Sequence, residues 1–146
     1  MKATIYIMKE QDTGNYTNCI GNYDFQRLQQ LAKKIIKLNL NRVFSILPTH
    51  TYDKNIRTFQ TASNLCTLLD KKLGICTTID DIPNYVYDNI LIVWDSTDIQ
   101  LILEKYGMVT PFVWPEDNFN GCVIINEHGW SFEPDFFSKK TCCYLF

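Results

Sequence analysis

Short apolar runs alternate with amphipathic segments along most of the chain. The apolar runs have the length and the β-branched content of buried strands. They cover residues 3–8, 42–47, 75–79 and 89–94, of which 89–94 is the clearest. In the segments between them, apolar residues recur every three or four positions, which predicts helices packed by one face. These helices cover residues 25–38, 53–73 and 99–106.

Turn and capping residues mark the ends of the predicted elements. Asp24 is suited to cap the first helix, and the segment 95–98, Asp-Ser-Thr-Asp, to cap the last one. Gly74 is expected to close the central helix and Gly107 the last, because glycine commonly follows a helix C-terminus.

The last third of the chain changes character, since proline and glycine divide it into short pieces. Residues 121–125 and 130–132, joined through the turn at 126–129, predict a β-hairpin. Strand–helix alternation followed by a hairpin predicts an α/β fold. We expect a three-layer sandwich: a mostly parallel sheet, helices on both faces and a C-terminal antiparallel hairpin. A single domain is expected over 1–138, followed by a tail over 139–146.

Composition narrows the class of protein. The 146 residues carry a net charge of −2, and no interleaved basic and aromatic surface is evident, so we expect no nucleic-acid partner. No apolar run approaches the ~20 residues of a membrane span. The six cysteines lack metal-ligand spacing, which favours reduced thiols in a cytoplasmic protein. Abundant Lys, Asn and Ile are typical of an AT-rich genome, such as that of a large DNA virus or a parasite. The setting would then be a host cytoplasm or a virion.

Arg57 is the first residue that suggests a binding site. It lies near the start of the central helix, just after the strand predicted over 42–47. Ligands of open α/β sheets bind at the carboxyl ends of strands, and a helix N-terminus favours anions. Arg57 lies off the apolar stripe of its helix, so an ordinary surface arginine remains the alternative.

The segment 56–62, Ile-Arg-Thr-Phe-Gln-Thr-Ala, resembles the R-A-x-Q-T-A motif of the histidine phosphatase (phosphoglycerate mutase-like) superfamily. Residues 5–13 are similar in position to its first strand and L-Y-L-I-R-H-G-E-T motif. Residues 89–97 are similar in position to its V-L-V-V-S-H-G-G strand and turn. The resemblance covers about two-thirds of the chain in order and spacing. It implies an α/β fold with a phosphate pocket at the strand ends.

The chain departs from the family pattern at the catalytic positions. Where the family has its nucleophilic histidine, this chain has Glu10, and Lys9 replaces the preceding arginine. Asp95 replaces the second histidine. Of the phosphate-pocket core only Arg57 is unchanged. The family's acid/base carboxylate has no assignable equivalent in the short segment that contains Asp80 and Asp81.

These departures decide the expected function. Glu10 cannot form a phosphohistidine, and Glu10 and Asp95 neutralise Lys9 and Arg57, so the pocket is unsuited to a dianion. We expect Glu10 and Asp95 to form salt bridges with Lys9 and Arg57. The resemblance thus implies a catalytically inactive, vestigial phosphate pocket in a binding or virion-associated protein without a cofactor. Its partner is an unidentified protein or a second copy in a homodimer. The alternative is a divergent phosphatase acting on a phosphate monoester through Arg57 with Glu10 or Asp95.

Other candidates are weaker. His50 and His128 are expected at the surface, and the three carboxylates Glu10, Asp95 and Asp98 lack a metal-binding motif. The aromatic residues of the last third are expected to pack in the core, with a protein contact through an exposed Trp114, beside prolines, as the alternative. The C-terminal Cys143-Tyr-Leu-Phe fits a C-a-a-X lipidation pattern, with an apolar segment packed on the domain as the alternative. A membrane partner is expected only if Cys143 is lipidated.

Overall fold

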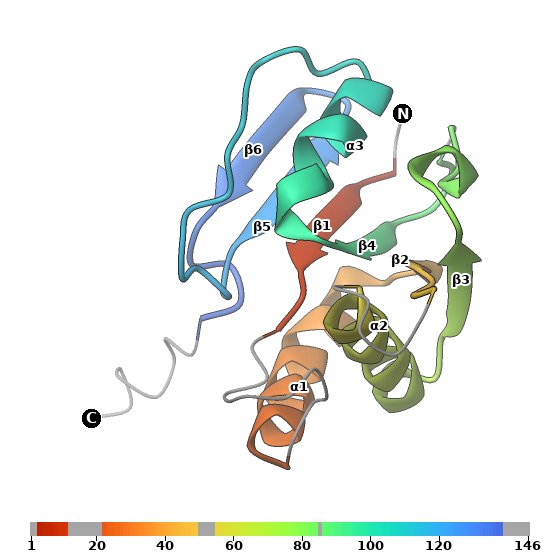
Figure 1. Ribbon diagram of the computed structural model, residues 1–146, viewed down its shortest axis with the longest axis vertical. Helices are drawn as coiled ribbons and strands as arrows, with labels where there is room; N and C mark the ends of the chain where they lie inside the picture. Colours follow the sequence, from red (N-terminus) through yellow and green to blue (C-terminus); the bar gives the residue numbers. More distant parts are fainter. Residues whose placement is uncertain (1–2, 12–21, 50–54, 85, 139–146) are drawn as a thin grey trace.

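The computed structural model describes residues 3–11, 22–49, 55–84 and 86–138, with side chains from residue 26 onward in the second range. Six strands form one sheet in the order β3-β2-β4-β1-β5-β6 (Figure 1). The strands are β1 (Ile5–Lys9), β2 (Arg42–Ile46), β3 (Lys72–Cys76), β4 (Ile90–Trp94), β5 (Cys122–Asn126) and β6 (Gly129–Glu133). The first four are parallel, and β5 and β6 form the predicted antiparallel hairpin at one side.

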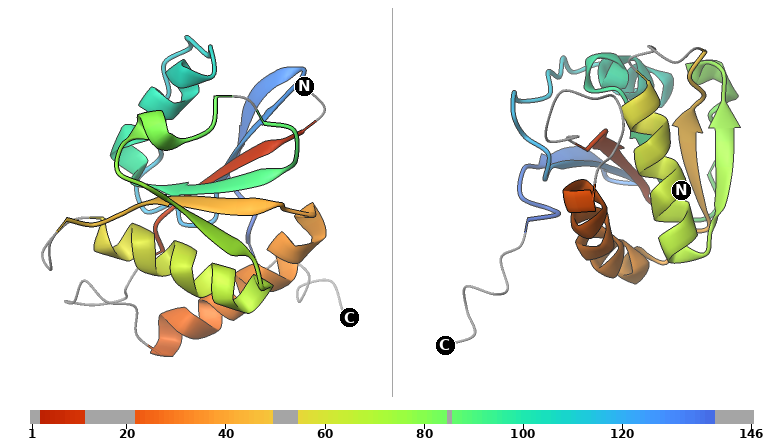
Figure 2. Two further views of the ribbon diagram at one scale, coloured as in Figure 1. Left: turned by 90° about the vertical axis from the view of Figure 1, so that its right-hand side faces the viewer. Right: turned by 60° about the horizontal axis from the view of Figure 1, so that its bottom comes forward.

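Helices cover both faces of this sheet. They are α1 (Asn22–Ile35), α2 (Ile56–Leu69) and α3 (Ile99–Lys105), with short 3-10 turns η1 (Ile36–Leu38), η2 (Ile79–Asp81) and η3 (Ser96–Asp98). Helices α1 and α2 lie side by side on one face, whereas α3 lies on the other (Figures 1 and 2). The predicted three-layer α/β sandwich is confirmed. None of the helices in the described ranges is long and apolar enough to cross a membrane.

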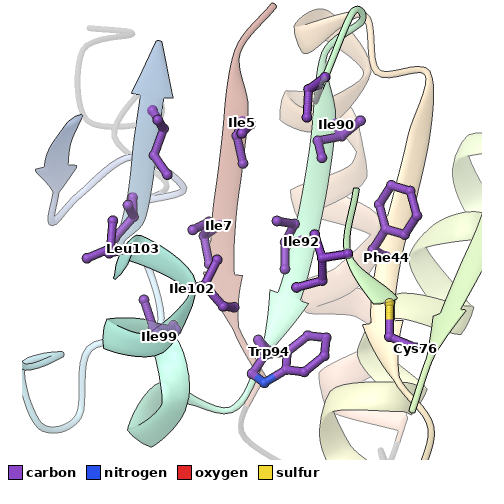
Figure 3. Close-up of a cluster of buried hydrophobic side chains, with 14 of the residues drawn as sticks. Ile5, Ile7, Phe44, Cys76, Ile90, Ile92, Trp94, Ile99, Ile102 and Leu103 are labelled. Carbon is purple, nitrogen blue, oxygen red and sulfur yellow. The ribbon is translucent and has the colours of Figure 1, made fainter. Parts of the chain in front are cut away.

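Each face of the sheet has its own hydrophobic core, because side chains alternate between the faces along a strand. Ile5, Ile7, Ile92 and Trp94 point toward α3 (Figure 3). Met8, Leu91 and Val93 point the other way, toward α1 and α2. The central strand β4 is buried at all five positions. Burial on both faces explains why its sequence is continuously apolar.

The central helix ends earlier than predicted. Leu73 continues its apolar stripe, but α2 stops at Leu69, and Asp70 follows in the left-handed conformation with φ 54°. Gly74 therefore lies in β3 and does not close the helix. A Cβ on Gly74 would come within 2.4 Å of the Phe44 ring on β2, so a larger residue would clash there. Tertiary packing, and not a turn, requires the glycine.

Trp114 lies in the hydrophobic core. It is buried, and its indole N–H donates to the Asn118 carbonyl at 2.9 Å. Its ring packs edge-on against Phe132, with 5.0 Å between the centroids. Core packing of Trp114, the main expectation, is therefore confirmed, and the alternative of an exposed protein contact is wrong. His128, in contrast, is exposed in the hairpin turn as predicted, and His50 lies outside the described residues.

Candidate functional site

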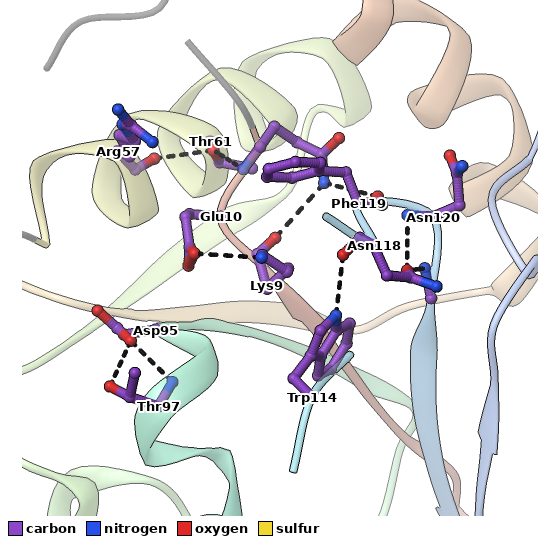
Figure 4. A network of polar contacts seen from close by, with 12 residues as sticks. Lys9, Glu10, Arg57, Thr61, Asp95, Thr97, Trp114, Asn118, Phe119 and Asn120 are labelled. Carbon is purple, nitrogen blue, oxygen red and sulfur yellow. Dashed lines mark hydrogen bonds and ion pairs between the residues drawn. The ribbon is translucent and has the colours of Figure 1, made fainter. Parts of the chain in front are cut away.

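The predicted site lies at the carboxyl edge of the central strands. Lys9 and Trp94 are paired at the ends of the parallel strands β1 and β4. Glu10 and Asp95 are the next residues on the two strands, so the topology brings these two carboxylates to the same edge (Figure 4). Arg57 lies in the first turn of α2, near the same edge.

Lys9 is held inside the protein by two neighbours. Its Nζ lies 3.9 Å from Glu10 Oε1, and the Lys9 side chain is only 11% exposed. The same Nζ lies 4.3 Å from the centroid of the Phe119 ring, a cation–π contact. Phe119 belongs to the segment between α3 and β5, so a distant part of the chain covers the lysine. The charge of Lys9 is therefore already in contact with groups of the protein itself.

Glu10 occupies an environment that disfavours its charge. Burial raises the pKa of the Glu10 carboxyl, Lys9 lowers it, and the nearby Asp95 raises it further. Its Oε2 atom is buried and accepts no hydrogen bond from the described part of the chain. A carboxylate oxygen without a donor costs free energy when charged, which favours the neutral acid. Glu10 is thus a carboxyl group with a raised pKa at the centre of the candidate site.

Asp95 serves the local backbone. Its Oδ1 accepts hydrogen bonds from the Thr97 N–H at 2.8 Å and from the Thr97 hydroxyl at 2.6 Å. This is the predicted capping role, carried out at η3 immediately before α3. Asp95 connects the end of β4 to η3 and α3.

The expected salt bridge of Arg57 with Glu10 or Asp95 does not form. The prediction was right for Lys9 and Glu10 but wrong for Arg57, whose guanidinium points away from both carboxylates (Figure 4). Within the described part of the chain, no carboxylate lies within ion-pair distance of Arg57. The Arg57 side chain is partly exposed.

Three further residues hold the site in place, and the sequence interpretation assigned them no role. The Gln11 backbone N–H donates to the Thr61 hydroxyl at 3.2 Å, and that hydroxyl donates to the Arg57 carbonyl at 2.8 Å. The Gln11 side chain, which is buried, donates to the Phe119 carbonyl at 3.1 Å. Thr61 is part of the R-A-x-Q-T-A-like segment, which was the available signal for it. Nothing in the sequence indicated Phe119.

The chemistry open to this site is limited. Among the described residues no cluster of three or more His, Cys, Asp or Glu side chains is placed to bind a metal ion. Two adjacent carboxylates oppose an anion, whereas the partly exposed Arg57 favours one. Cys143, the candidate for lipidation, lies outside the described residues.

Comparison with known proteins identifies the fold. No protein-family model matches the chain, and no curated protein sequence matches it. Among solved structures, the chain is similar to SixA from Agrobacterium tumefaciens, assigned as a phosphohistidine phosphatase. The two share 8% sequence identity over 91% of this chain and 97% of SixA, with a TM-score of 0.55. At this identity the likeness shows a common fold over nearly the whole chain.

Proposed function

We propose that this chain is a histidine-phosphatase-like protein that has lost both catalytic histidines and acts as a binding or structural protein. One observation carries the proposal: Glu10 stands where the family resemblance places the phosphorylated histidine. Its carboxyl is buried and lies beside Lys9. A carboxyl group cannot form a phosphohistidine, and the nearby Asp95 adds negative charge where a phosphoryl group would need cations.

The polar contacts support the same conclusion. In a phosphatase the groups around the phosphate are held ready for a ligand. Here Lys9 contacts Glu10 and Phe119, and Asp95 caps its own turn. Three of the four residues of the vestigial pocket (Lys9, Glu10, Arg57 and Asp95) therefore already serve the protein itself. Because these residues already contact other parts of the protein, a structural role suits the pocket better than a catalytic role does.

Turnover measurements test this proposal. The purified chain is incubated with a phosphohistidine-containing protein and with p-nitrophenyl phosphate, with and without Mg²⁺, and phosphate release is followed. We expect no release above the rate without protein. Turnover that disappears in Glu10→Gln would overturn the proposal and identify Glu10 as a nucleophile or acid.

A divergent phosphatase is the second candidate, and the orientation of Arg57 favours it. Its guanidinium makes no hydrogen bond or ion pair with any described residue, is partly exposed, and belongs to the first turn of a helix. A cation in this position is suited to a phosphate group. The raised pKa of Glu10 is also compatible with a general acid.

Thermal melts with phosphate distinguish the two candidates. An anion that binds only the folded state raises the melting temperature by mass action. For a closed pocket we expect inorganic phosphate to change the wild type and Arg57→Ala equally. An increase that occurs in the wild type and is lost in Arg57→Ala would favour the phosphatase. Lys33→Ala, which removes an exposed lysine on α1, controls for general effects of charge.

A further inference from the structure

The charges of this chain are strongly segregated. Residues 26–72 contain nine Lys and Arg but only two Asp, whereas residues 73–138 contain eleven Asp and Glu and one Lys. The chain as a whole has a net charge of only −2. The near-neutral total therefore conceals two regions of opposite sign.

The fold places most of these charges on opposite faces of the sheet, although Glu133 and Asp135 of the acidic region line one pocket with Lys34 of α1. The basic region includes α1 and α2, which cover one face, and the acidic region includes η2 and α3 on the other (Figure 2). Exposed lysines of the α1/α2 layer, taken as α1, η1, α2 and the turn that follows α2, are Lys33, Lys37 and Lys71. Exposed acids of the α3 layer, taken as η2, α3 and residues 107–121, are Asp80, Asp81, Glu104, Glu116 and Asp117. The molecule is thus electrically asymmetric across the sheet.

A groove with apolar walls lies between α1 and α2 within the basic layer. Its volume is about 420 Å³, and it is lined by Gln29, Ala32, Lys33, Ile36, Leu68 and Leu69. Ile36, just after α1, is 63% exposed. An apolar groove with Lys33 at its rim is suited to a partner that presents apolar side chains beside acids.

The α3 layer has that chemistry. Leu101 on α3 is 51% exposed, and Val109 and Val113 in the following segment are 86% and 88% exposed. Glu104, Glu116 and Asp117 on the same layer are also exposed. The two layers are therefore complementary in both charge and hydrophobic character.

We infer that the α1/α2 layer of one copy binds the α3 layer of a second copy, so that the protein associates head to tail. Each copy contributes a different face, which makes the contact heterologous; such contacts form rings or open chains. The inference rests on the structural role proposed above, to which it gives a partner. A monomeric protein would overturn it without changing the result of the turnover test.

Sedimentation velocity tests the association directly. At low ionic strength, about 0.01 M, we expect species larger than a monomer that increase with protein concentration. At about 1 M the Debye length falls to ~3 Å, and we expect a shift toward monomer. A protein that stays monomeric at low salt up to the highest soluble concentration would overturn the inference.

Two variants test the head-to-tail geometry. Ile36→Asp places an acid in the groove, and Val109→Lys with Val113→Lys places cations on the acidic layer. All three positions are exposed, so we expect normal folding, checked by circular dichroism. Each variant alone should be monomeric. A mixture of the two should form dimers, because one retains an intact α3 layer and the other an intact groove.

A control separates this contact from pairing through the edge strand β3. Ile75→Lys changes an exposed residue of that strand and should leave association unchanged. Loss of association in Ile75→Lys, or failure of the two face variants to complement each other while the wild type associates, would indicate a symmetric contact and overturn the inference.

Discussion

Gln11 and Thr61, 50 residues apart in sequence, join the end of β1 to α2 through a hydrogen bond of 3.2 Å from the Gln11 N–H to the Thr61 hydroxyl. Both side chains are buried. The same hydroxyl donates to the Arg57 carbonyl at 2.8 Å. Thr61 therefore fixes the strand end that carries Glu10 relative to the helical turn that carries Arg57.

Thr61→Val is expected to destabilise the fold by about 1–3 kcal/mol, because it leaves the buried Gln11 N–H without an acceptor. Urea denaturation measures the change in the free energy of unfolding. Thr67→Val is the matched control: its hydroxyl also donates to a carbonyl four residues earlier, but it is exposed. We expect the control to change stability by less than about 0.5 kcal/mol. Equal effects at the two positions would contradict the role given to Thr61.

Glu10→Gln is expected to stabilise the protein near neutral pH. Because burial raises the pKa of Glu10 in the folded state, folding disfavours its charged form. At pH values below the unfolded pKa, about 4.3, the acid is neutral in both states and carries no penalty. The penalty develops as the pH rises through the folded pKa. The melting temperature of Glu10→Gln relative to that of the wild type should increase as the pH rises from 3 to 8.

Asp81→Asn provides a control of opposite sign. Hydrogen bonds from the Thr77 side chain and from the Thr77 and Thr78 N–H groups lower the pKa of the Asp81 carboxyl. Its contribution to stability is therefore present at neutral pH and is lost as the pH falls through the lowered pKa. Asp81→Asn should lower the stability of the protein at pH 7, and this effect should become smaller as the pH falls. If both variants showed the same pH trend, the interpretation of Glu10 would be wrong.

Gly74→Ala is expected to destabilise the protein by about 1–3 kcal/mol, as overpacking does in other cores. The new methyl group would meet the Phe44 ring at 2.4 Å. Phe44→Leu removes that ring, so the double variant should be less destabilised than the sum of the two single ones. A double-mutant cycle in urea measures this coupling. Additive effects would show that the clash is not with Phe44.

The buried cysteines are expected to resist alkylation in the folded protein. Burial raises the pKa of the Cys66 and Cys76 thiols to about 11, and it also raises that of Cys122. At pH 8 the thiolate fraction of Cys66 and Cys76 should be about 100-fold below that of an ordinary thiol, before access is considered. Iodoacetamide labelling mapped by mass spectrometry should show slow modification until denaturant is added. Fast labelling of Cys66 in the native state would contradict its burial.

The sequence predicts those elements whose order of apolar and polar residues is set by burial on one or both faces of the sheet. The continuous apolar runs of β4 and β5 and the alternation in β6 are consequences of burial on two faces or on one. The end of α2 could not be predicted in this way, because Leu73 keeps the helical spacing. The helix ends where Asp70 takes the left-handed conformation and residues from Lys72 onward pair with β2, about 30 residues earlier in the chain.

The candidate site, like the fold, could be predicted from the sequence only in part. The proximity of Glu10 and Asp95 follows from a general rule, since parallel strands end at a common edge. The direction of the Arg57 side chain does not, because an arginine has several rotatable bonds and its choice depends on neighbours. Phe119, which covers Lys9 from more than 100 positions away, carries no local signal.

The central position of β1 has a consequence for synthesis on the ribosome. Its first residue, Ile5, pairs with Ile90 on one side and with Ile125 on the other. The strand is therefore translated long before either neighbour. Its edge toward β4 stays unpaired until residue 90 has been translated, and its edge toward β5 until residue 122. Such long-range pairing slows folding and leaves unpaired edges open to aggregation. The nascent chain should consequently depend on holding chaperones more than a protein whose early strands pair with each other.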